Sequence, residues 1–112
     1  MIKIAMPVFG DRISNRLDCA ENIQVTEIDN NKIVKQEVVK MYNDNQLEKI
    51  NLLIQINPDT VICDGITEIC NIKLAEKNIN VIPWIQGNSK DIINKYLTGK
   101  LYSHTENLIT KE

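Results

Sequence analysis

Hydrophobic and polar positions alternate along the first third of the chain with the period of a β-strand. Residues 2–8 alternate in this way up to Pro7, which predicts a first strand. Residues 22–28 and 33–41 are also alternating and rich in β-branched side chains. The polar residues 29–32 between them tolerate the positive φ angles of a tight turn. These two segments are therefore predicted to form an antiparallel hairpin.

Helical periodicity alternates with short apolar runs in the rest of the chain. Asn45 is a typical N-cap residue for a helix that extends to about Ile56, where Pro58 follows. The later elements are predicted in this order: a buried strand over 60–63, a helix over 66–77 with Ile66, Ile69, Cys70 and Leu74 on its apolar face, an edge strand over 81–85, and a helix that Ser89 caps and Gly99 ends.

The order β-β-β-α-β-α-β-α predicts an α/β fold with a mixed five-stranded sheet. We expect one domain over residues 1–101 and a disordered tail over 102–112. If the first, fourth and fifth strands are parallel neighbours, their carboxyl ends bring together residues 9–21, 63–65 and 84–89. Open α/β sheets commonly bind ligands in such a crevice. An edge strand near Val81 also offers a place for a second chain, although the oligomeric state is not readable from the sequence.

Composition narrows the function classes. The chain has 112 residues, is 43% hydrophobic and 25% charged, and has a formal net charge of −2, so we expect no nucleic-acid partner. It has no signal-peptide pattern and no apolar stretch able to span a bilayer, so we expect a cytoplasmic protein with no membrane partner. Its three cysteines lack zinc-binding spacing and are expected to be free thiols.

The loop 9–21 is too long for a simple strand connection, and it contains chemically useful side chains. Arg12 and Arg16 suit an anionic ligand, and Ser14 can donate a hydrogen bond. Cys19 lies near both cations, which favour the thiolate form that binds soft metals. A surface loop with an ordinary thiol is the alternative interpretation.

Other residues at the same sheet end are weaker candidates. Cys63 belongs to an apolar strand, where packing competes with a metal-lining role. Residues 86–89 open a helix whose amide groups could bind an anion. Cys70 is assigned to the core, and His104, the single histidine, lies in the tail with no assigned role.

Enzyme classes find little support in these residues. A cysteine or serine nucleophile needs a base within hydrogen-bond reach, and no histidine accompanies the crevice. The first strand has no acidic residue for a two-metal nuclease, and neither a P-loop nor a GxGxxG motif follows it. We therefore expect a protein that is not an enzyme, and a metal-dependent nuclease or hydrolase ranks third among the functions considered.

An ordered set of short segments resembles the dinitrogenase iron-molybdenum cofactor biosynthesis family. They are residues 1–7, 11–14 with Ala20, 59–66, 75–81 and 96–101. The resemblance implies a three-layer fold similar to ribonuclease H, and a role in binding or carrying iron–sulfur or iron–molybdenum clusters or their precursors in a setting related to nitrogen fixation. It also implies a cofactor-assembly protein as a possible partner.

The family's usual pattern has a histidine two residues after the serine, as a cluster ligand. Arg16 stands at that position here, and a guanidinium stays protonated and does not ligate metal. Three alternatives stay open: Cys19 replaces the histidine, the arginines hold an anionic cluster, or the cluster is absent.

The resulting hypothesis is a non-catalytic carrier of such a cluster. The alternative is a metal-free interaction or regulatory module on the same fold. The predicted cofactor-binding residues are Arg12, Ser14, Arg16, Cys19, Asp64, Gly65, Gly87 and Asn88, and the predicted metal ligands are Cys19 and Cys63.

Overall fold

The structure, a computed structural model, describes residues 1–41, 45–99 and 101. Its elements follow one another in the order β1 (Ile2–Phe9), β2 (Arg12–Ile13), the 3-10 helix η1 (Leu17–Cys19), β3 (Asn22–Asp29), β4 (Lys32–Lys40), α1 (Gln46–Ile56), β5 (Thr60–Ile62), α2 (Glu68–Glu76), β6 (Asn80–Ile82) and α3 (Ser89–Leu97). The expected strands and helices are all present, and β2 and η1 are additional.

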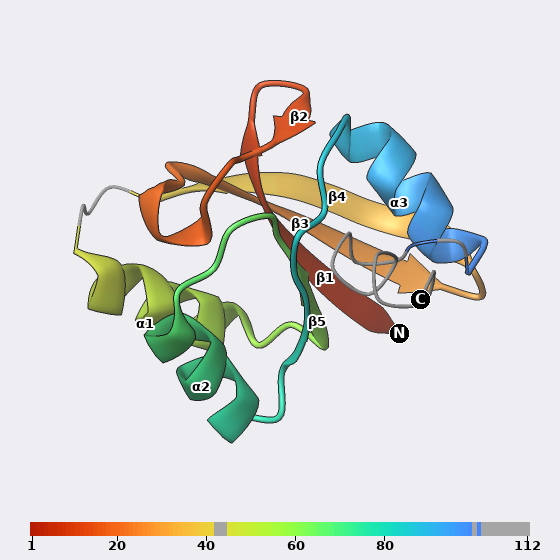
Figure 1. The fold of residues 1–112 in the computed structure, drawn as a ribbon. Coiled ribbons are helices and arrows are strands. Elements are labelled where there is room, and N and C mark those ends of the chain that lie inside the picture. Colours follow the sequence, from red (N-terminus) through yellow and green to blue (C-terminus); the bar gives the residue numbers. More distant parts are fainter. Residues whose placement is uncertain (42–44, 100, 102–112) are drawn as a thin grey trace, which may run out of the picture.

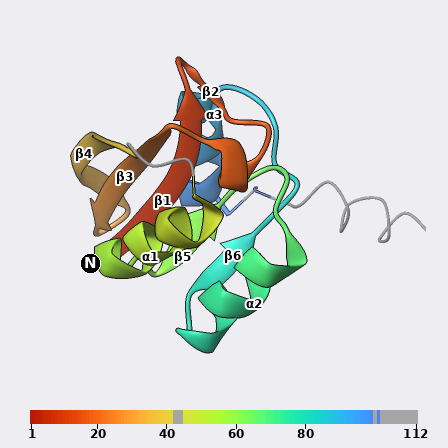
Figure 2. The same cartoon turned by 90° about the vertical axis from the view of Figure 1, so that its left-hand side faces the viewer.

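The sheet has the strand order β4-β3-β1-β5-β6, and β2 pairs with β1 beside this path. β1 is antiparallel to β3 and parallel to β5, and β5 is parallel to β6. Helices α1 and α2 cover one face of the sheet and α3 covers the other (Figures 1 and 2). The chain therefore has the predicted three-layer α/β fold with a mixed sheet, with six strands instead of five.

Each face of the sheet has its own hydrophobic core. Ala5 of β1 belongs to the cluster that packs against α1 and α2, together with Ile23 and Val25 of β3. Ile4 and Met6 point the other way and pack with Ile92 and Ile93 of α3. Because successive side chains of a strand point to opposite faces, the alternation in β1 supplies both cores from the centre of the sheet.

The β3–β4 hairpin forms as predicted. Asn30 and Asn31 have φ angles of 51° and 64°, which matches the preference for asparagine where a tight hairpin turn requires positive φ. A bulge shifts the register between Glu27 and Ile28, so that Lys35 pairs with Glu27 and Ile33 with Ile28. This bulge was not visible in the alternation pattern.

Two helix starts differ from the expectation. Asn88, not Ser89, caps α3, because its Oδ1 accepts from the amides of Lys90 at 2.9 Å and Asp91 at 3.4 Å. Thr67 caps α2 through a hydrogen bond from the Cys70 amide at 3.2 Å, so this helix starts at Glu68 and not at Ile66.

The predicted apolar face of α2 is partly wrong. Cys70 and Leu74 are buried against the sheet as expected, whereas Ile69 is 57% exposed. Cys70 and Leu74, four residues apart, define the buried side of α2, and Ile69 lies about 100° around the helix axis from Cys70. Asn45 caps α1 as predicted, accepting from the Leu47 amide at 2.8 Å. Gly99 follows α3 with a φ angle of 71°, as expected of a residue that ends a helix.

Within the described ranges, α1, α2 and α3 are each too short and too polar to cross a membrane. The expected disordered tail over 102–112, with His104, lies outside the described residues. The domain boundary at 101 therefore stays a prediction.

Candidate functional site

The loop between β1 and β3 is folded rather than extended. β1 continues one residue further than expected and turns through Gly10, whose φ angle is 62°, into the short strand β2. Val8 pairs with Ile13 and Phe9 with Arg12 in this small hairpin. The 3-10 helix η1 follows before the chain enters β3. The length that marked this segment as a loop is therefore taken up by two small elements.

Three apolar side chains of this loop enter the two cores. Ile13 is 2% exposed and packs into the cluster on the α3 side of the sheet. Leu17 and Ala20 pack into the opposite cluster, next to α1 and α2. The loop therefore crosses the end of the sheet, and its buried side chains anchor it in the hydrophobic core on each face. The polar side chains between these attachments are left at the surface.

Main-chain hydrogen bonds tie the loop to the two other segments at this end of the sheet. The Ile13 amide donates to the Gly87 carbonyl at 3.0 Å, and the Leu17 amide donates to the Gly65 carbonyl at 2.9 Å. The Gly65 amide in turn donates to the Asn15 carbonyl at 2.8 Å. The structure therefore brings together the three segments whose convergence the parallel strands predicted. Figure 1 shows β2 beside the segment that leads into α3.

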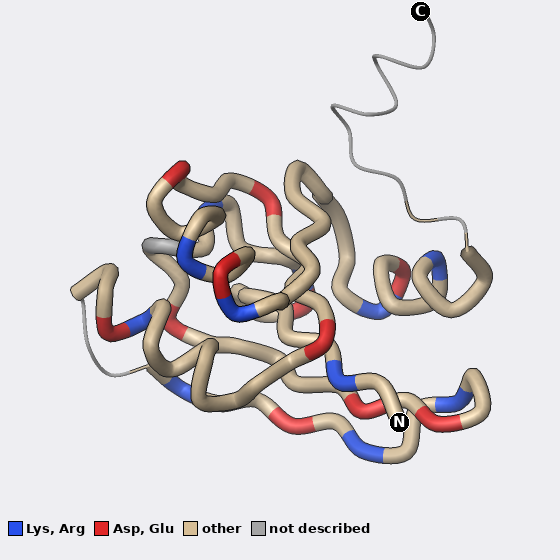
Figure 3. Tube along the Cα trace, turned by 90° about the horizontal axis from the view of Figure 1, so that it is seen from below, with Lys and Arg blue, Asp and Glu red and all other residues tan. Residues whose placement is uncertain are grey.

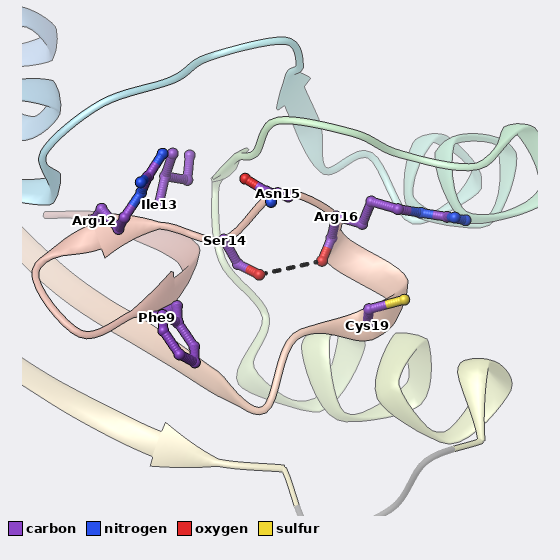
Figure 4. Close-up of a pocket in the computed structure, with 7 residues that line it drawn as sticks. All are labelled: Phe9, Arg12, Ile13, Ser14, Asn15, Arg16 and Cys19. Atoms are coloured by element: carbon purple, nitrogen blue, oxygen red, sulfur yellow. Dashed lines mark hydrogen bonds between the residues drawn. The ribbon is translucent and has the colours of Figure 1, made fainter.

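A hollow of about 460 Å³ lies on the outer side of this loop. The residues that line it are Phe9, Arg12, Ile13, Ser14, Asn15, Arg16 and Cys19. Four of the eight predicted cofactor-binding residues are thus together: Arg12, Ser14, Arg16 and Cys19. The Ser14 hydroxyl donates to the Arg16 carbonyl at 3.5 Å, a long contact that leaves the hydroxyl at the surface (Figure 4).

The two arginines of this hollow point in different directions. In Figure 4 the guanidinium of Arg16 extends away from Ser14, on the side where the Cys19 thiol lies. Arg12 extends on the opposite side of Ser14, next to Ile13. The thiol and one guanidinium therefore share one end of the hollow.

A second hollow of about 470 Å³ adjoins the first and shares Phe9 and Arg12 with it. Gly87 and Asn88 line this second hollow, as do Gly10 and Asp11. The amide groups at the start of α3 are already hydrogen-bonded within the chain. Ser89 donates to the Asp11 carbonyl at 2.9 Å, and the next two amides donate to the Asn88 side chain. The predicted anion site on these amides is therefore occupied by the protein itself.

Cys63, Asp64 and Gly65 lie beneath the loop and line neither hollow. The Cys63 side chain is fully buried, and burial raises the pKa of its thiol from 9.0 to about 12, with smaller contributions from Cys70 and Asp64. A thiol that keeps its proton is a poor metal ligand. Gly65 contributes main-chain contacts to Asn15 and Arg16 instead of a ligand group. Cys19 is exposed and is the thiol at the hollow.

The described residues contain no group of three or more histidine, cysteine, aspartate or glutamate side chains that could hold a metal ion. Charged positions of both signs are interspersed along the chain (Figure 3), in keeping with the formal net charge of −2. The positive character of the hollow is therefore local, from Arg12 and Arg16. It suits a small anion better than an extended polyanion.

Sequence reasoning missed three residues of the hollow, Phe9, Ile13 and Asn15. Phe9 is the single phenylalanine of the chain, and its ring is 72% exposed between the two hollows. The one available signal was an aromatic residue placed directly after the predicted first strand. Asn15 could not be singled out, because what positions it is the main-chain bond from Gly65.

Together, the mixed sheet with helices on both faces and the loop-lined hollow at the carboxyl end of β1 define a three-layer α/β protein with a candidate ligand site at its surface. No protein-family model matches the chain, and no curated protein matches it in sequence.

Solved structures do match the fold. The alignment with the crystal structure of PH0822 covers 92% of this chain and 95% of the PH0822 chain, with 19% identity and a TM-score of 0.86. A proposed dinitrogenase from Methanocaldococcus jannaschii is 24% identical, covers 89% of this chain and 91% of its own, and has a TM-score of 0.72. The alignment with the apo form of the orange protein from Desulfovibrio gigas covers 89% of this chain and 90% of that protein, with 14% identity and a TM-score of 0.74. These matches confirm, at the level of the fold, the resemblance noted in the sequence.

Proposed function

We propose that this chain is a non-catalytic carrier of an anionic iron–sulfur or iron–molybdenum type cluster, or of a precursor of one. The observation that supports this most directly is the hollow in which Arg16 and Cys19 share one end. A guanidinium neutralises and hydrogen-bonds an anionic sulfide cluster, and an exposed thiolate binds a soft metal. Ser14 supplies a further donor between the two arginines.

The cluster arrives preformed. The described residues offer no set of three metal ligands, so this part of the chain cannot assemble a metal centre from single ions. A preformed cluster already has sulfide ligands and a negative charge. It needs from the protein at most one thiolate, from Cys19, together with positive charge and hydrogen bonds.

The carrier performs no chemistry on its cargo. None of the described residues that line the hollow is a histidine, so this lining supplies no imidazole to act as a general base. The buried Cys63 thiol holds its proton and does not reach the hollow. Binding and release are therefore the functions that these side chains support.

The comparisons support a cofactor-related role. One similar structure is of a proposed dinitrogenase, and another was solved as an apo form, a term for a protein without its bound group. Arg16 at the family's histidine position changes the mode of binding from ligation by an imidazole to attraction of an anion. We extend the carrier role to this chain on that basis.

Anaerobic reconstitution with a cluster preassembled from iron, sulfide and molybdate is expected to yield a coloured protein that keeps its metal through gel filtration. Cys19→Ser is expected to lose most of the bound metal if the thiol ligates the cluster. Metal analysis and the visible absorption spectrum measure both results. Cys70→Ala is the matched control, because it also removes a thiol, but one that is buried on the inner side of α2 and does not line the hollow.

Two further outcomes separate the alternatives. Metal retained by Cys19→Ser assigns the binding to the arginines. A wild-type protein that stays colourless and metal-free contradicts the carrier role. In that case the second function, a metal-free interaction module, gains weight, because the 72% exposed ring of Phe9 at the same hollow is typical of a protein contact.

Arg16→Gln is expected to weaken cluster binding about tenfold or more, because a hydrogen bond to a charged group contributes about 1.5–3 kcal/mol. Arg12→Gln should have a smaller effect, since its guanidinium points away from the Cys19 end of the hollow. Titration of the apo protein with the isolated cluster gives the dissociation constants. Lys73→Gln on α2 removes one exposed positive charge elsewhere and serves as the control. Equal affinities for Arg16→Gln and Lys73→Gln would remove Arg16 from the site.

A further inference from the structure

The edge strand β4 is a second surface with unusual properties. It is one end of the sheet order β4-β3-β1-β5-β6, and its outer side faces away from the rest of the molecule (Figure 2). It is nine residues long, whereas the opposite edge strand β6 has three residues and runs into Pro83. β4 therefore offers by far the longer row of backbone groups for pairing with another strand.

Large apolar side chains of β4 are exposed. Val34 and Val38 are 54% and 59% exposed, and Ile33 is 44% exposed. Val38 pairs with Gln24, and Gln24 and Gln36 line a hollow beside α3, so Gln36 and Val38 face the α3 side of the sheet. Ile33 lines the same hollow, because the extra residue of the bulge, Val34, shifts the alternation by one position. Apolar side chains on a long edge strand are the pattern that strand addition uses.

The charged residues Lys35 and Glu37 occupy the opposite face of the same strand. Glu37 pairs with Val25 of β3, which belongs to the core beside α1 and α2. Charges on an edge strand usually prevent edge-to-edge pairing. Here their order along the strand matters, because two antiparallel copies place a lysine of one chain opposite a glutamate of the other in one register.

Few registers are available to two antiparallel β4 strands related by a two-fold axis. Side chains on the same face must meet, so the central residue pairs with itself and the others pair symmetrically around it. With Gln36 at the centre, Lys35 of each chain lies opposite Glu37 of the other. With Glu37 at the centre two glutamates meet, and with Lys35 at the centre two lysines meet. The Gln36 register alone among these three joins opposite charges.

We propose that β4 pairs with β4 of a second copy of this chain, antiparallel and centred on Gln36, to form a continuous sheet across a symmetric dimer. The paired segment is centred on residues 35–37 of each chain, with two lysine–glutamate pairs on one face. The bulge at Val34 of each chain limits the pairing at both ends. Because the segment is short, the dimer is in concentration-dependent exchange with the monomer. The sequence suggested an edge strand near Val81 as the place where a second chain pairs. We place that pairing on β4 instead.

Charge reversal tests this arrangement. Glu37→Lys places lysines opposite lysines in both symmetric pairs and is expected to weaken dimerisation at least tenfold. Lys35→Glu combined with Glu37→Lys exchanges the two charges and is expected to restore it. The two single variants, each with like charges on β4, are expected to form a mixed dimer when combined. Sedimentation velocity over a concentration series up to about 1 mM measures all four results.

Controls separate dimerisation from folding. Lys35→Glu also places a negative charge opposite Glu27 of the same chain, which is expected to lower the stability of the fold. Unfolding curves are therefore recorded for every variant. Glu76→Lys makes the same charge change as Glu37→Lys, at an exposed position on α2, and should leave the association unchanged. A wild-type protein that is monomeric throughout the series overturns the proposal. So does a dimer that all variants retain, or a charge-exchanged variant that stays monomeric while folded.

Discussion

Above pH 9 the folded protein is expected to lose about 1.4 kcal/mol of stability per pH unit through Cys63 alone. Burial, with smaller effects of Cys70 and Asp64, raises the pKa of this thiol from 9.0 to about 12 in the folded state. In the unfolded chain the thiol is in water and ionises at its ordinary pKa. Between the two values the folded state binds more protons, so stability falls as pH rises. The contribution of Cys63 to the free energy of unfolding is fully present below about pH 9 and is lost by about pH 12. The total loss is roughly 4 kcal/mol.

The matched variant for this test is Cys63→Ala. Lysine and tyrosine side chains also titrate in this range, but they are common to both proteins and cancel in the difference. The variant is less stable than the wild type below pH 9, and the gap is expected to close as pH rises toward 12. Urea unfolding at intervals of half a pH unit measures it. Parallel stability curves would mean that the thiol ionises in the folded state as easily as in water.

Gly65→Ala is expected to lower the free energy of unfolding by about 1–3 kcal/mol and to disturb the hollow. A Cβ atom at this position would lie 2.9 Å from the Asn15 carbonyl oxygen and 3.2 Å from Cγ of Arg16. The Asn15 oxygen is main chain and accepts the Gly65 amide at 2.8 Å, so it cannot move away without loss of that bond. The main chain at Asn15 and Arg16 must therefore move to make room for the added methyl group.

Gly99→Ala provides the comparison for this substitution. A Cβ there has nothing within 4 Å, but the φ angle of 71° is unfavourable for alanine, so stability falls by about 1–2 kcal/mol at a distance from the hollow. Denaturant unfolding gives the stabilities, and the reconstitution assay gives the metal content. Gly65→Ala should lose both, and Gly99→Ala only stability. A Gly65→Ala protein with wild-type stability would contradict the close approach of the two segments.

The fold was accessible from the sequence because its main signals are local. Alternation placed the central strands, the asparagines at 30 and 31 placed the hairpin turn, and two helix-to-strand crossovers gave the parallel half of the sheet. β2 and η1 were not accessible, because two and three residues are too few to show a period. Long-range main-chain bonds to Gly65 and Gly87 stabilise that part of the loop.

The site was predictable in its place but not in its membership. The carboxyl ends of parallel strands meet at one end of a sheet, which located the three converging segments. The spacing of residues along the sequence does not show how deeply each side chain is buried. Cys63 was therefore grouped with Cys19, although the Cys63 thiol is buried and the Cys19 thiol is exposed. Asn88 and Ser89 are both good caps. Asn88 caps α3, while the Ser89 hydroxyl donates to the Asp11 carbonyl at 3.2 Å.

The way the loop is held has a consequence for how such proteins diversify. Its shape depends on main-chain bonds and on the buried side chains of Ile13, Leu17 and Ala20. The side chains of Arg12, Ser14, Arg16 and Cys19 line the hollow on this frame, so substitution there is expected to alter what the hollow binds more than the course of the main chain. Under the proposed function, an arginine in place of the family's histidine is a change of specificity on an unchanged frame. The same frame is a natural starting point for receptors designed to select other small anions.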